Sequence, residues 1–183
     1  PRRDRPPRAP LPAPRKLPAP EEWPSTLKLE EFRLLPRIKW DAGFCEAWTP
    51  GTPGAQRELK RFAKSAVRDY KIDRDRPDHH GTSRLSSCLH FGELSPRQIW
   101  HEVCAALGED PERPQVAEPY LRQLIWRDFG HHLLYHFPQT VTTPLREDFT
   151  RFPWKNNSAY LRAWQRGLTG FPIVDAGMRE LWH

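Results

Sequence analysis

The stretch GTSRLSSCLHFGELSPRQIW, residues 81–100, gathers hydroxyl side chains directly before the signals of a helix start. Its first half places four hydroxyl residues around one arginine: Thr82, Ser83, Ser86 and Ser87 around Arg84. Hydroxyls and the N–H groups of a helix N-terminus both donate hydrogen bonds to anions. Residues 82–86, called the hydroxyl loop below, therefore suit a phosphate. An ordinary helix cap with a spare arginine would have the same composition.

Helical signals surround this stretch on both sides. Residues 95–98, SPRQ, form a capping box with Pro at the first helical position, and the apolar stripe behind it is Ile99, Val103 and Leu107. Thr52-Pro53 opens an earlier helix, whose buried stripe is Leu59, Phe62, Ala63, Ala66, Val67 and Tyr70. We expect later helices over about 116–137, 158–164 and 175–182, with a loop over 139–153. Since no segment alternates with a strand period, the predicted fold is all-α.

Composition divides the chain into three parts. Residues 1–24 hold nine of the 21 prolines and read as a disordered Pro/Ala/Arg linker. Residues 25–54 scatter hydrophobic anchors between prolines and predict an irregular interdomain segment. The folded helical part is expected over 55–183. The net charge of +6 lies mostly in residues 1–20, which carry six basic residues and one acidic residue, so any DNA-binding surface of the folded part must be local.

The cysteines and the apolar runs indicate the class of protein. The three cysteines, Cys45, Cys88 and Cys104, form no CxxC pair, so we do not expect a disulfide framework. We expect instead a reducing, cytoplasmic compartment. No apolar run approaches the ~20 residues of a membrane span. The chain starts at Pro1 and ends at Trp182-His183, so we expect an excerpt from a longer protein.

The longest expected helix has two different faces. Counting 100° per residue, an aromatic plate, an amide and a guanidinium share one arc of about 120°, namely Tyr120, Gln123, Trp126 and Arg127. The opposite arc is apolar and predicts a packed face with Leu121, Leu124, Ile125, Phe129 and Leu133. A base stacked on an aromatic ring gains about 1–3 kcal/mol, so the first face suits a nucleobase. The same tryptophan would also suit an ordinary core.

Several long motifs stand in register over about 27–182, and together they resemble the flavin-binding domain of the DNA photolyase/cryptochrome family. They are YKIDRDRP at 70–77, TSRLS at 82–86, FGELSPR at 91–97, QLIWRDF at 123–129 and WQRGLTGFPIVDAGMR at 164–179. The likeness is greatest to bacterial cyclobutane pyrimidine dimer photolyases. It implies the N-terminal half of the helical FAD-binding domain, with the C-terminal half and an N-terminal antenna domain outside this chain.

The resemblance implies a role for individual residues. The FAD phosphates would be held by Thr82, Ser83, Arg84, Leu85 and Ser86, and the cofactor would also touch Tyr70 and Tyr120. DNA would be contacted by Arg74, Gln123, Trp126 and Arg127, with Trp126 stacked on a flipped dimer. Gln123 stands where a photolyase usually carries Glu and where several cryptochromes and (6-4)-type photolyases carry Gln, so the lesion type, cyclobutane or (6-4), stays open. Trp154 matches the outermost electron-transfer tryptophan. His132 and His136 have metal-ligand spacing but no third ligand, so no metal site is expected.

The implied activity is light-driven, FAD-dependent repair of cyclobutane pyrimidine dimers in DNA, by a monomer that carries a folate-type antenna chromophore in the N-terminal domain. This chain alone is expected to bind FAD weakly or not at all and to be inactive. A cryptochrome without repair activity, an inactive gene remnant and a non-catalytic helical DNA-binding module remain as alternatives. All of these site assignments require the hydroxyl loop and the Trp126–Arg127 pair to face a common hollow.

Overall fold

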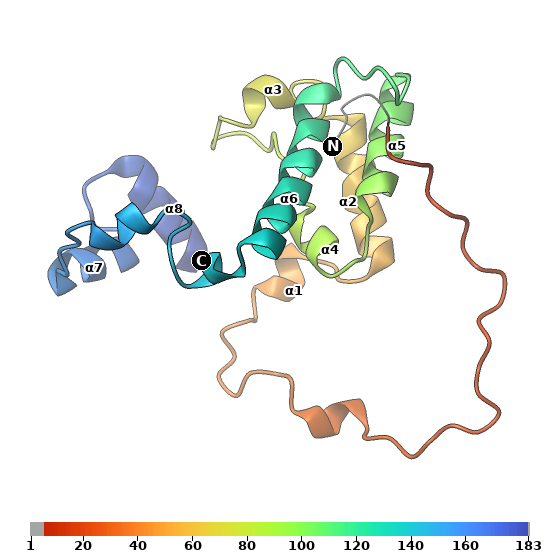
Figure 1. Cartoon of the computed structure of the whole chain (residues 1–183), viewed down its shortest axis with the longest axis horizontal. Helices are drawn as coiled ribbons and strands as arrows, with labels where there is room; N and C mark the ends of the chain where they lie inside the picture. Colours follow the sequence, from red (N-terminus) through yellow and green to blue (C-terminus); the bar gives the residue numbers. More distant parts are fainter. Residues whose placement is uncertain (1–5, 183) are drawn as a thin grey trace. The chain divides into compact units, whose positions relative to one another are not determined.

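The computed structural model describes residues 6–182, and within them all regular structure is helical. The prediction of an all-α fold is therefore confirmed over this range. The chain divides into two compact units, Pro1–Gly130 (unit 1) and His131–His183 (unit 2), and the division falls inside helix α6. Figure 1 shows the helices in chain order. Their bounds are η1 Leu29–Phe32, α1 Phe44–Ala47, α2 Thr52–Lys64, α3 Tyr70–Asp73, α4 Ser86–His90, α5 Pro96–Leu107, α6 Glu118–His136, η2 Pro138–Val141, η3 Glu147–Arg151, α7 Ser158–Gln165 and α8 Pro172–Trp182.

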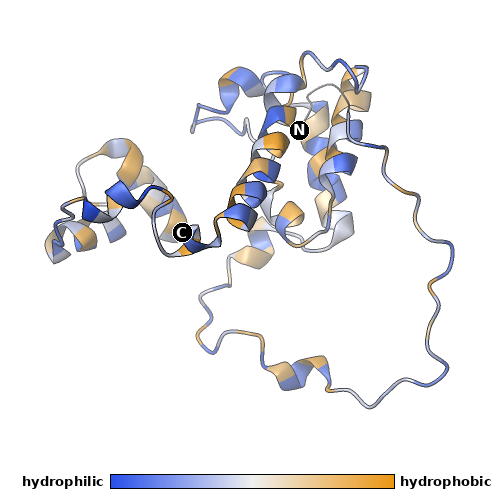
Figure 2. Ribbon diagram, in the orientation of Figure 1, coloured by the Kyte–Doolittle hydropathy of each residue, from blue (hydrophilic) through white to orange (hydrophobic). Residues whose placement is uncertain are grey.

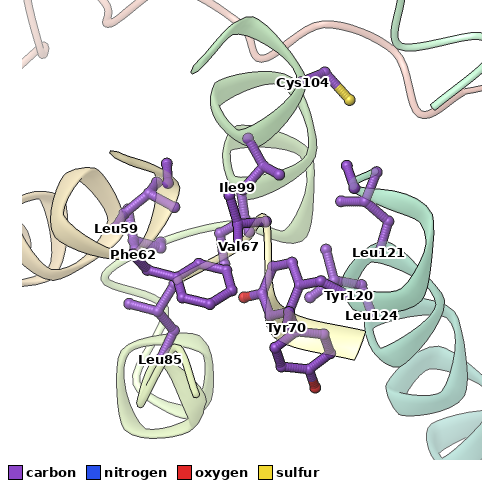
Figure 3. Packing of buried hydrophobic residues seen from close by; sticks show 14 of the residues in the cluster. Leu59, Phe62, Val67, Tyr70, Leu85, Ile99, Cys104, Tyr120, Leu121 and Leu124 are labelled. Carbon is purple, nitrogen blue, oxygen red and sulfur yellow. The ribbon is translucent and has the colours of Figure 1, made fainter. Parts of the chain in front are cut away.

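The core of unit 1 lies where α2, α5 and the first half of α6 meet. Figure 3 shows its apolar side chains converging from these helices and from the turns between them. The largest fully buried side chains are Phe62, Leu85, Ile99, Leu121, Val67, Val103 and Cys104. Burying a large apolar side chain stabilises a fold by about 1.5–3 kcal/mol. Leu85 belongs to the hydroxyl loop, so this core holds the loop in place.

Helix α2 ends earlier than its apolar stripe predicts. Three stripe residues lie beyond the end of the helix at Lys64: the half-buried Ala66 in a turn, and the last two, Val67 in the same turn and Tyr70 at the start of α3. The Ser65 hydroxyl donates to the Arg61 carbonyl at 2.8 Å, and the Val67 N–H turns back to the Phe62 carbonyl at 3.1 Å. A serine that bonds its own backbone competes with helix continuation. Val67 and Tyr70 are nevertheless buried, so the burial was predicted correctly and the single helix was wrong.

Helix α5 begins and ends as its local sequence predicts. The Ser95 hydroxyl accepts from the Gln98 N–H at 3.2 Å, and the Gln98 side chain accepts from the Ser95 N–H at 2.8 Å. This reciprocal pair satisfies two N–H groups that have no partner within the helix. The helix ends at Leu107 and is capped by Gly108, whose φ of 69° is the left-handed conformation that glycine adopts without strain.

Helix α6 begins at a carboxylate from the preceding turn. Glu109 accepts hydrogen bonds from the N–H groups of Gln115, Val116 and Ala117, at 3.2, 2.6 and 3.1 Å. A negative charge at a helix N-terminus is favourable because it meets both the free N–H groups and the helix dipole. Glu109 therefore sets where α6 starts and hence which side chains its first turns direct toward the core.

Unit 2 is built on the pair α7 and α8. Helix α8 starts at Pro172, three residues before the predicted start, because proline fits the first turn of a helix. Its first turn carries Asp175, which accepts from the Thr169 N–H at 2.8 Å, the Thr169 hydroxyl at 2.6 Å and the Gly170 N–H at 3.0 Å. These hydrogen bonds, most of all that from the Thr169 hydroxyl, lower the pKa of Asp175. Figure 2 colours much of α8 as hydrophobic, yet Ile173, Leu181 and Trp182 are exposed.

The segments before α2 are mostly extended. Residues 8–34 are exposed, and the apolar anchors of the interdomain segment are exposed too, including Leu35, Ile38 and Trp40. Two short turns, η1 and α1, interrupt this segment, which Figure 1 shows leaving the helices near α5 and returning at α1. The His101 ring lies 2.9 Å from the Pro7 carbonyl oxygen at its start.

Candidate functional site

The hydroxyl loop connects α3 to α4 in unit 1. Its backbone is brought close to α3 by Gly81, because a Cβ on this residue would lie 2.5 Å from Asp73 Cβ and 2.6 Å from the Asp73 carbonyl oxygen. The side chains of Thr82 and Ser86 are exposed, and no described residue forms a hydrogen bond with either hydroxyl. Helix α4 has only five residues, so the hydroxyls rather than a long helix dipole are the anion-binding groups here.

Three aromatic rings gather behind the loop. The centroid of Phe62 lies 4.5 Å from that of Tyr120 and 5.9 Å from that of Tyr70, and the two tyrosine rings are 5.2 Å apart. Figure 3 shows these rings together, each from a different helix. Two of the pairs, Phe62–Tyr70 and Tyr70–Tyr120, are edge-to-face, an arrangement that contributes about 0.5–1.5 kcal/mol beyond the area that it buries. The two tyrosines predicted as cofactor contacts are thus brought together, by a phenylalanine that sequence reasoning treated only as core.

Ser83 affects the pKa of a tyrosine in this cluster. Burial raises the pKa of Tyr120 to about 12, an interaction with the Ser83 side chain opposes that rise, and Tyr70 adds to it. The Ser83 hydroxyl also accepts from the Leu85 N–H at 3.4 Å. Ser83 therefore supports the bend of the loop, behind which the Tyr120 ring is buried. The helical wheel placed Tyr120 on the open face, but its side chain is only 4% exposed because Phe62 and Tyr70 pack around it.

Arg74 lies beside the tyrosine cluster at the end of α3. Its guanidinium carbon is 5.4 Å from the centroid of the Tyr70 ring. Burial raises the pKa of Tyr70, and the Arg74 charge partly opposes this. Arg74 itself is exposed and also pairs with Asp75 at 3.6 Å. Arg74 therefore places an exposed cation beside the Tyr70 ring, where Asp75 partly balances its charge.

The three remaining side chains of the predicted substrate face differ in exposure. Trp126 is 59% exposed and packs edge-on against Phe129 at 5.7 Å. Gln123 is half-buried, and its amide donates to the Pro119 carbonyl of its own helix at 3.3 Å. Arg127 is half-buried and donates to the Leu89 carbonyl at 3.3 Å. This last bond joins α6 to α4, directly after the hydroxyl loop.

The apolar face of α6 is packed only in its first turns. Leu121 and Leu124 are buried as predicted, whereas Ile125 and Phe129 are exposed by 45% and 44%. The prediction of a continuous packed face was therefore wrong at Ile125 and Phe129, while Leu133 is half-buried. The core formed by α2 and α5 reaches only the start of α6, so later turns of the same stripe extend past it.

A hollow of about 470 Å³ in unit 1 lies away from this site. It is formed by α2 and α5 together with Pro10 of the Pro-rich segment, and its lining includes Leu59, Gln98 and His101. None of the predicted site residues lines it. The region of the hydroxyl loop and α6 are instead joined by a direct contact, the hydrogen bond from Arg127 to the Leu89 carbonyl of α4.

Trp154, the predicted electron-transfer residue, belongs to unit 2. It follows η3, is 79% exposed, and its ring lies 4.6 Å from that of Phe152. His132 and His136 have ring centroids 4.3 Å apart on the last turns of α6.

The chain matches a known family of flavin-binding domains. The profile described as the FAD binding domain of DNA photolyase matches residues 120–183. A deoxyribodipyrimidine photo-lyase of Agrobacterium fabrum is 39% identical over 177 residues, which is 96% of this chain and 36% of the relative. Cryptochrome-1 of Arabidopsis thaliana is 33% identical over 147 residues, 78% of this chain and 22% of the relative. The crystal structure of a bacterial class III photolyase from Agrobacterium tumefaciens superimposes with a TM-score of 0.80 at 38% identity, covering 91% of this chain and 34% of that one.

The chain belongs to the DNA photolyase/cryptochrome family. It spans about a third of the length of the photolyase relatives that it matches. The family membership predicted from the motifs is thereby confirmed, and the profile match begins at Tyr120, in the first turn of α6. No helix among residues 6–182 has the length and apolar character that a membrane span would need.

Sequence reasoning missed three contacts of the photolyase-like site. Phe62 organises the tyrosine pair, Trp48 packs against Arg84, and Glu93 accepts from the Gly51 N–H. Trp48 and Arg84 are 36 residues apart and Gly51 and Glu93 are 42 apart, so no local spacing could reveal these contacts. The one available signal was a tryptophan four residues before the helix start at Thr52-Pro53.

Proposed function

We propose that the protein carrying this chain is a deoxyribodipyrimidine photolyase that uses FAD and blue light to repair cyclobutane pyrimidine dimers in DNA. The observation that supports this most is the hydrogen bond from Arg127 of α6 to the Leu89 carbonyl, at 3.3 Å, which joins α6 to the helix that starts in the hydroxyl loop. It brings donors that suit a dinucleotide phosphate next to the helix that carries an exposed tryptophan and an arginine. An ordinary helix cap would not require this second connection.

The residues of the loop fit the phosphates of FAD. The hydroxyls of Thr82 and Ser86 are donors not engaged by described residues, and Gly81 lets the backbone approach without a Cβ. Hydrogen bonds to charged groups contribute about 1.5–3 kcal/mol each. Tyr70 and Tyr120 lie behind the loop, where they would limit access of water to the cofactor. The chemistry that FAD supplies when bound is electron donation to the dimer under light and recovery of the electron after the ring has split.

The α6 side chains would hold the damaged DNA. Trp126 offers an exposed indole on which a flipped dimer can stack, at about 1–3 kcal/mol per base, and flipping a damaged pair costs less than flipping an intact one. Gln123 would hydrogen-bond the dimer, and Arg74 and Arg127 would contact backbone phosphate. Trp154, exposed in unit 2, would take up electrons from a reductant and pass them inward. A domain that precedes this chain would hold a folate-type antenna chromophore. The whole protein would be a cytoplasmic monomer.

The assay for this proposal is loss of dimers from ultraviolet-treated DNA under blue light, with darkness as the blank. The protein carrying this chain should remove dimers only in light. Trp126→Ala should weaken binding of dimer-containing DNA by about 1–3 kcal/mol, roughly five- to 150-fold. Tyr135→Ala is the matched control, because Tyr135 is an exposed aromatic residue on the same helix. Light-independent loss, or equal effects of both substitutions, would contradict the proposal.

A cryptochrome-type photoreceptor is the second candidate, and Gln123 together with the likeness to Cryptochrome-1 favours it. In that case the protein would bind flavin and respond to light but leave dimers intact. Gln123→Glu discriminates further: a photolyase should gain repair rate from the carboxyl group, while a photoreceptor should remain without repair. An absorbance spectrum without a flavin band would instead indicate an inactive gene remnant or a helical DNA-binding module.

A further inference from the structure

The segment before α2 is attached to the hydroxyl loop and the turn that follows it at two points. The Arg84 guanidinium carbon lies 4.7 Å from the ring centroid of Trp48. Three residues further along, the Gly51 N–H donates to the Glu93 carboxylate at 2.5 Å. Both contacts join residues of the interdomain segment to residues on either side of α4. Neither contact is local in sequence, so each depends on the folded unit.

The backbone of Arg84 adopts a conformation that needs support. Its φ is 54°, in the left-handed region that residues other than glycine, asparagine and aspartate seldom occupy. A strained backbone of this kind persists only where surrounding contacts hold it. On one side Leu85 is anchored in the core, with its N–H bonded to the Ser83 hydroxyl. On the other side, Trp48 is the contact that holds the Arg84 side chain.

Trp48 is held in place without help from Arg84. The Gly51 contact to Glu93 fixes the chain three residues after it. Gly54, at the start of α2, packs directly against the Thr49 carbonyl oxygen, where a Cβ would overlap the backbone. The indole is half-buried. An arginine over a tryptophan face is the strongest of the common cation–π pairs, so Trp48 offers Arg84 a fixed platform.

We propose that Arg84 is a positioning residue: its guanidinium stacks on Trp48 and so holds the left-handed bend that sets Thr82, Ser83 and Ser86 in place. The family resemblance assigns Arg84 a direct contact with FAD phosphate, and this positioning role takes the place of that contact. The bearing on FAD affinity rests on the proposed function, whereas the Trp48–Arg84 coupling does not. The interdomain segment thereby contributes to the order of the loop.

The coupling can be measured on this chain with no flavin present. The reporter is the Leu89 N–H, which donates to the Leu85 carbonyl at 3.0 Å and lies outside the substituted positions. Its hydrogen exchange reports opening of the turn that follows the loop. An exposed cation–π pair predicts that Trp48→Leu and Arg84→Met each speed exchange by roughly two- to fivefold. The double variant should be no faster than either single variant, because both remove the same contact.

Controls separate this coupling from general loosening. Trp23→Leu removes an exposed tryptophan of the same segment and should leave Leu89 exchange unchanged. The Val103 N–H in α5 should be unaffected in every variant. Trp48→Phe and Arg84→Lys keep a weaker cation–π pair and should restore most of the protection. They also serve as the test pair if Trp48→Leu lowers the helical circular dichroism.

Three results would overturn the proposal. The first is Leu89 exchange that Trp48→Leu leaves at the level of the Trp23→Leu control. The second is a double variant in which the two effects multiply, to roughly four- to 25-fold. The third is FAD binding, by the protein carrying this chain, that Arg84→Met abolishes and Trp48→Leu leaves intact, since Arg84 would then be a direct ligand. If that protein binds no FAD at all, the proposed function fails, while the flavin-free cycle still decides the coupling.

Discussion

Replacing Gly81 by alanine tests how the hydroxyl loop is placed. The new Cβ would lie 2.5 Å from Asp73 Cβ and 2.6 Å from the Asp73 carbonyl oxygen, where ordinary contacts begin at 3.4 Å. Either the loop or the end of α3 must therefore move by about 0.9 Å, the difference between the ordinary contact and the 2.5 Å separation. Forcing an extra carbon into packed structure costs about 1–3 kcal/mol. We expect Gly81→Ala to lower the free energy of unfolding by that amount.

The assay is urea unfolding followed by circular dichroism, with an unchanged dependence on urea showing that the unfolded state is unaltered. Gly130→Ala is the matched control, because it lies in α6 and a Cβ there meets no atom within 4 Å. Alanine at a helical position should raise stability by about 0.5–1 kcal/mol. If Gly81→Ala proves as stable as the parent, or if both substitutions destabilise equally, the close approach of loop and helix is refuted.

Three further outcomes follow from the charges and caps. Glu109→Gln should destabilise the start of α6 by about 1–2 kcal/mol, because the carboxylate accepts hydrogen bonds from three N–H groups there. The measurement is hydrogen exchange of the Val116 and Ala117 amides, which should become faster. Exchange equal to that of the parent would contradict this. Burial raises the pKa of Cys104 from 9.0 to about 11 and the pKa of Tyr120 from 10.0 to about 12. Both groups are neutral in the fold, so their contribution to stability is complete below pH 9 and is lost as pH rises from 9 to 12; a Cys104→Ala variant whose alkaline unfolding profile is unchanged would speak against the first. The lowered pKa of Asp175 means that its contribution is present above the ordinary value of 3.8 and is lost as pH falls below it. Asp175→Asn should make the stability of unit 2 depend less on pH below 3.8, as measured by unfolding at a series of acid pH values. An unchanged dependence on pH would exclude that role.

Helices with local signals could be predicted from the sequence, and their ends could be predicted only where a cap is local too. The Ser95–Gln98 box and Gly108 determine both ends of α5 within a few residues. The end of α2 depends on how Ser65 bonds its own backbone, which the apolar stripe over Val67 and Tyr70 does not reveal. The start of α6 depends on Glu109, whose partners are six to eight residues away.

The site could be predicted by type but not by arrangement. The motifs identified the hydroxyl loop and the aromatic and basic residues of α6. Helical geometry alone placed Tyr120 on the open face, and only the packing of Phe62 and Tyr70 around it explains its burial. Likewise, the packing of Arg84 against Trp48 could not be predicted, because the two residues are 36 positions apart in the sequence. Contacts between distant segments are the part that a single sequence does not disclose.

The most direct test of the central claim is hydrogen exchange of the protein carrying this chain, compared with and without bound FAD. We expect bound FAD to slow the exchange of backbone N–H groups most over residues 82–91 and in the first turn of α6 around Tyr120. Slower exchange centred on the hollow between α2 and α5, around Gln98 and His101, with residues 82–91 unchanged, would contradict it.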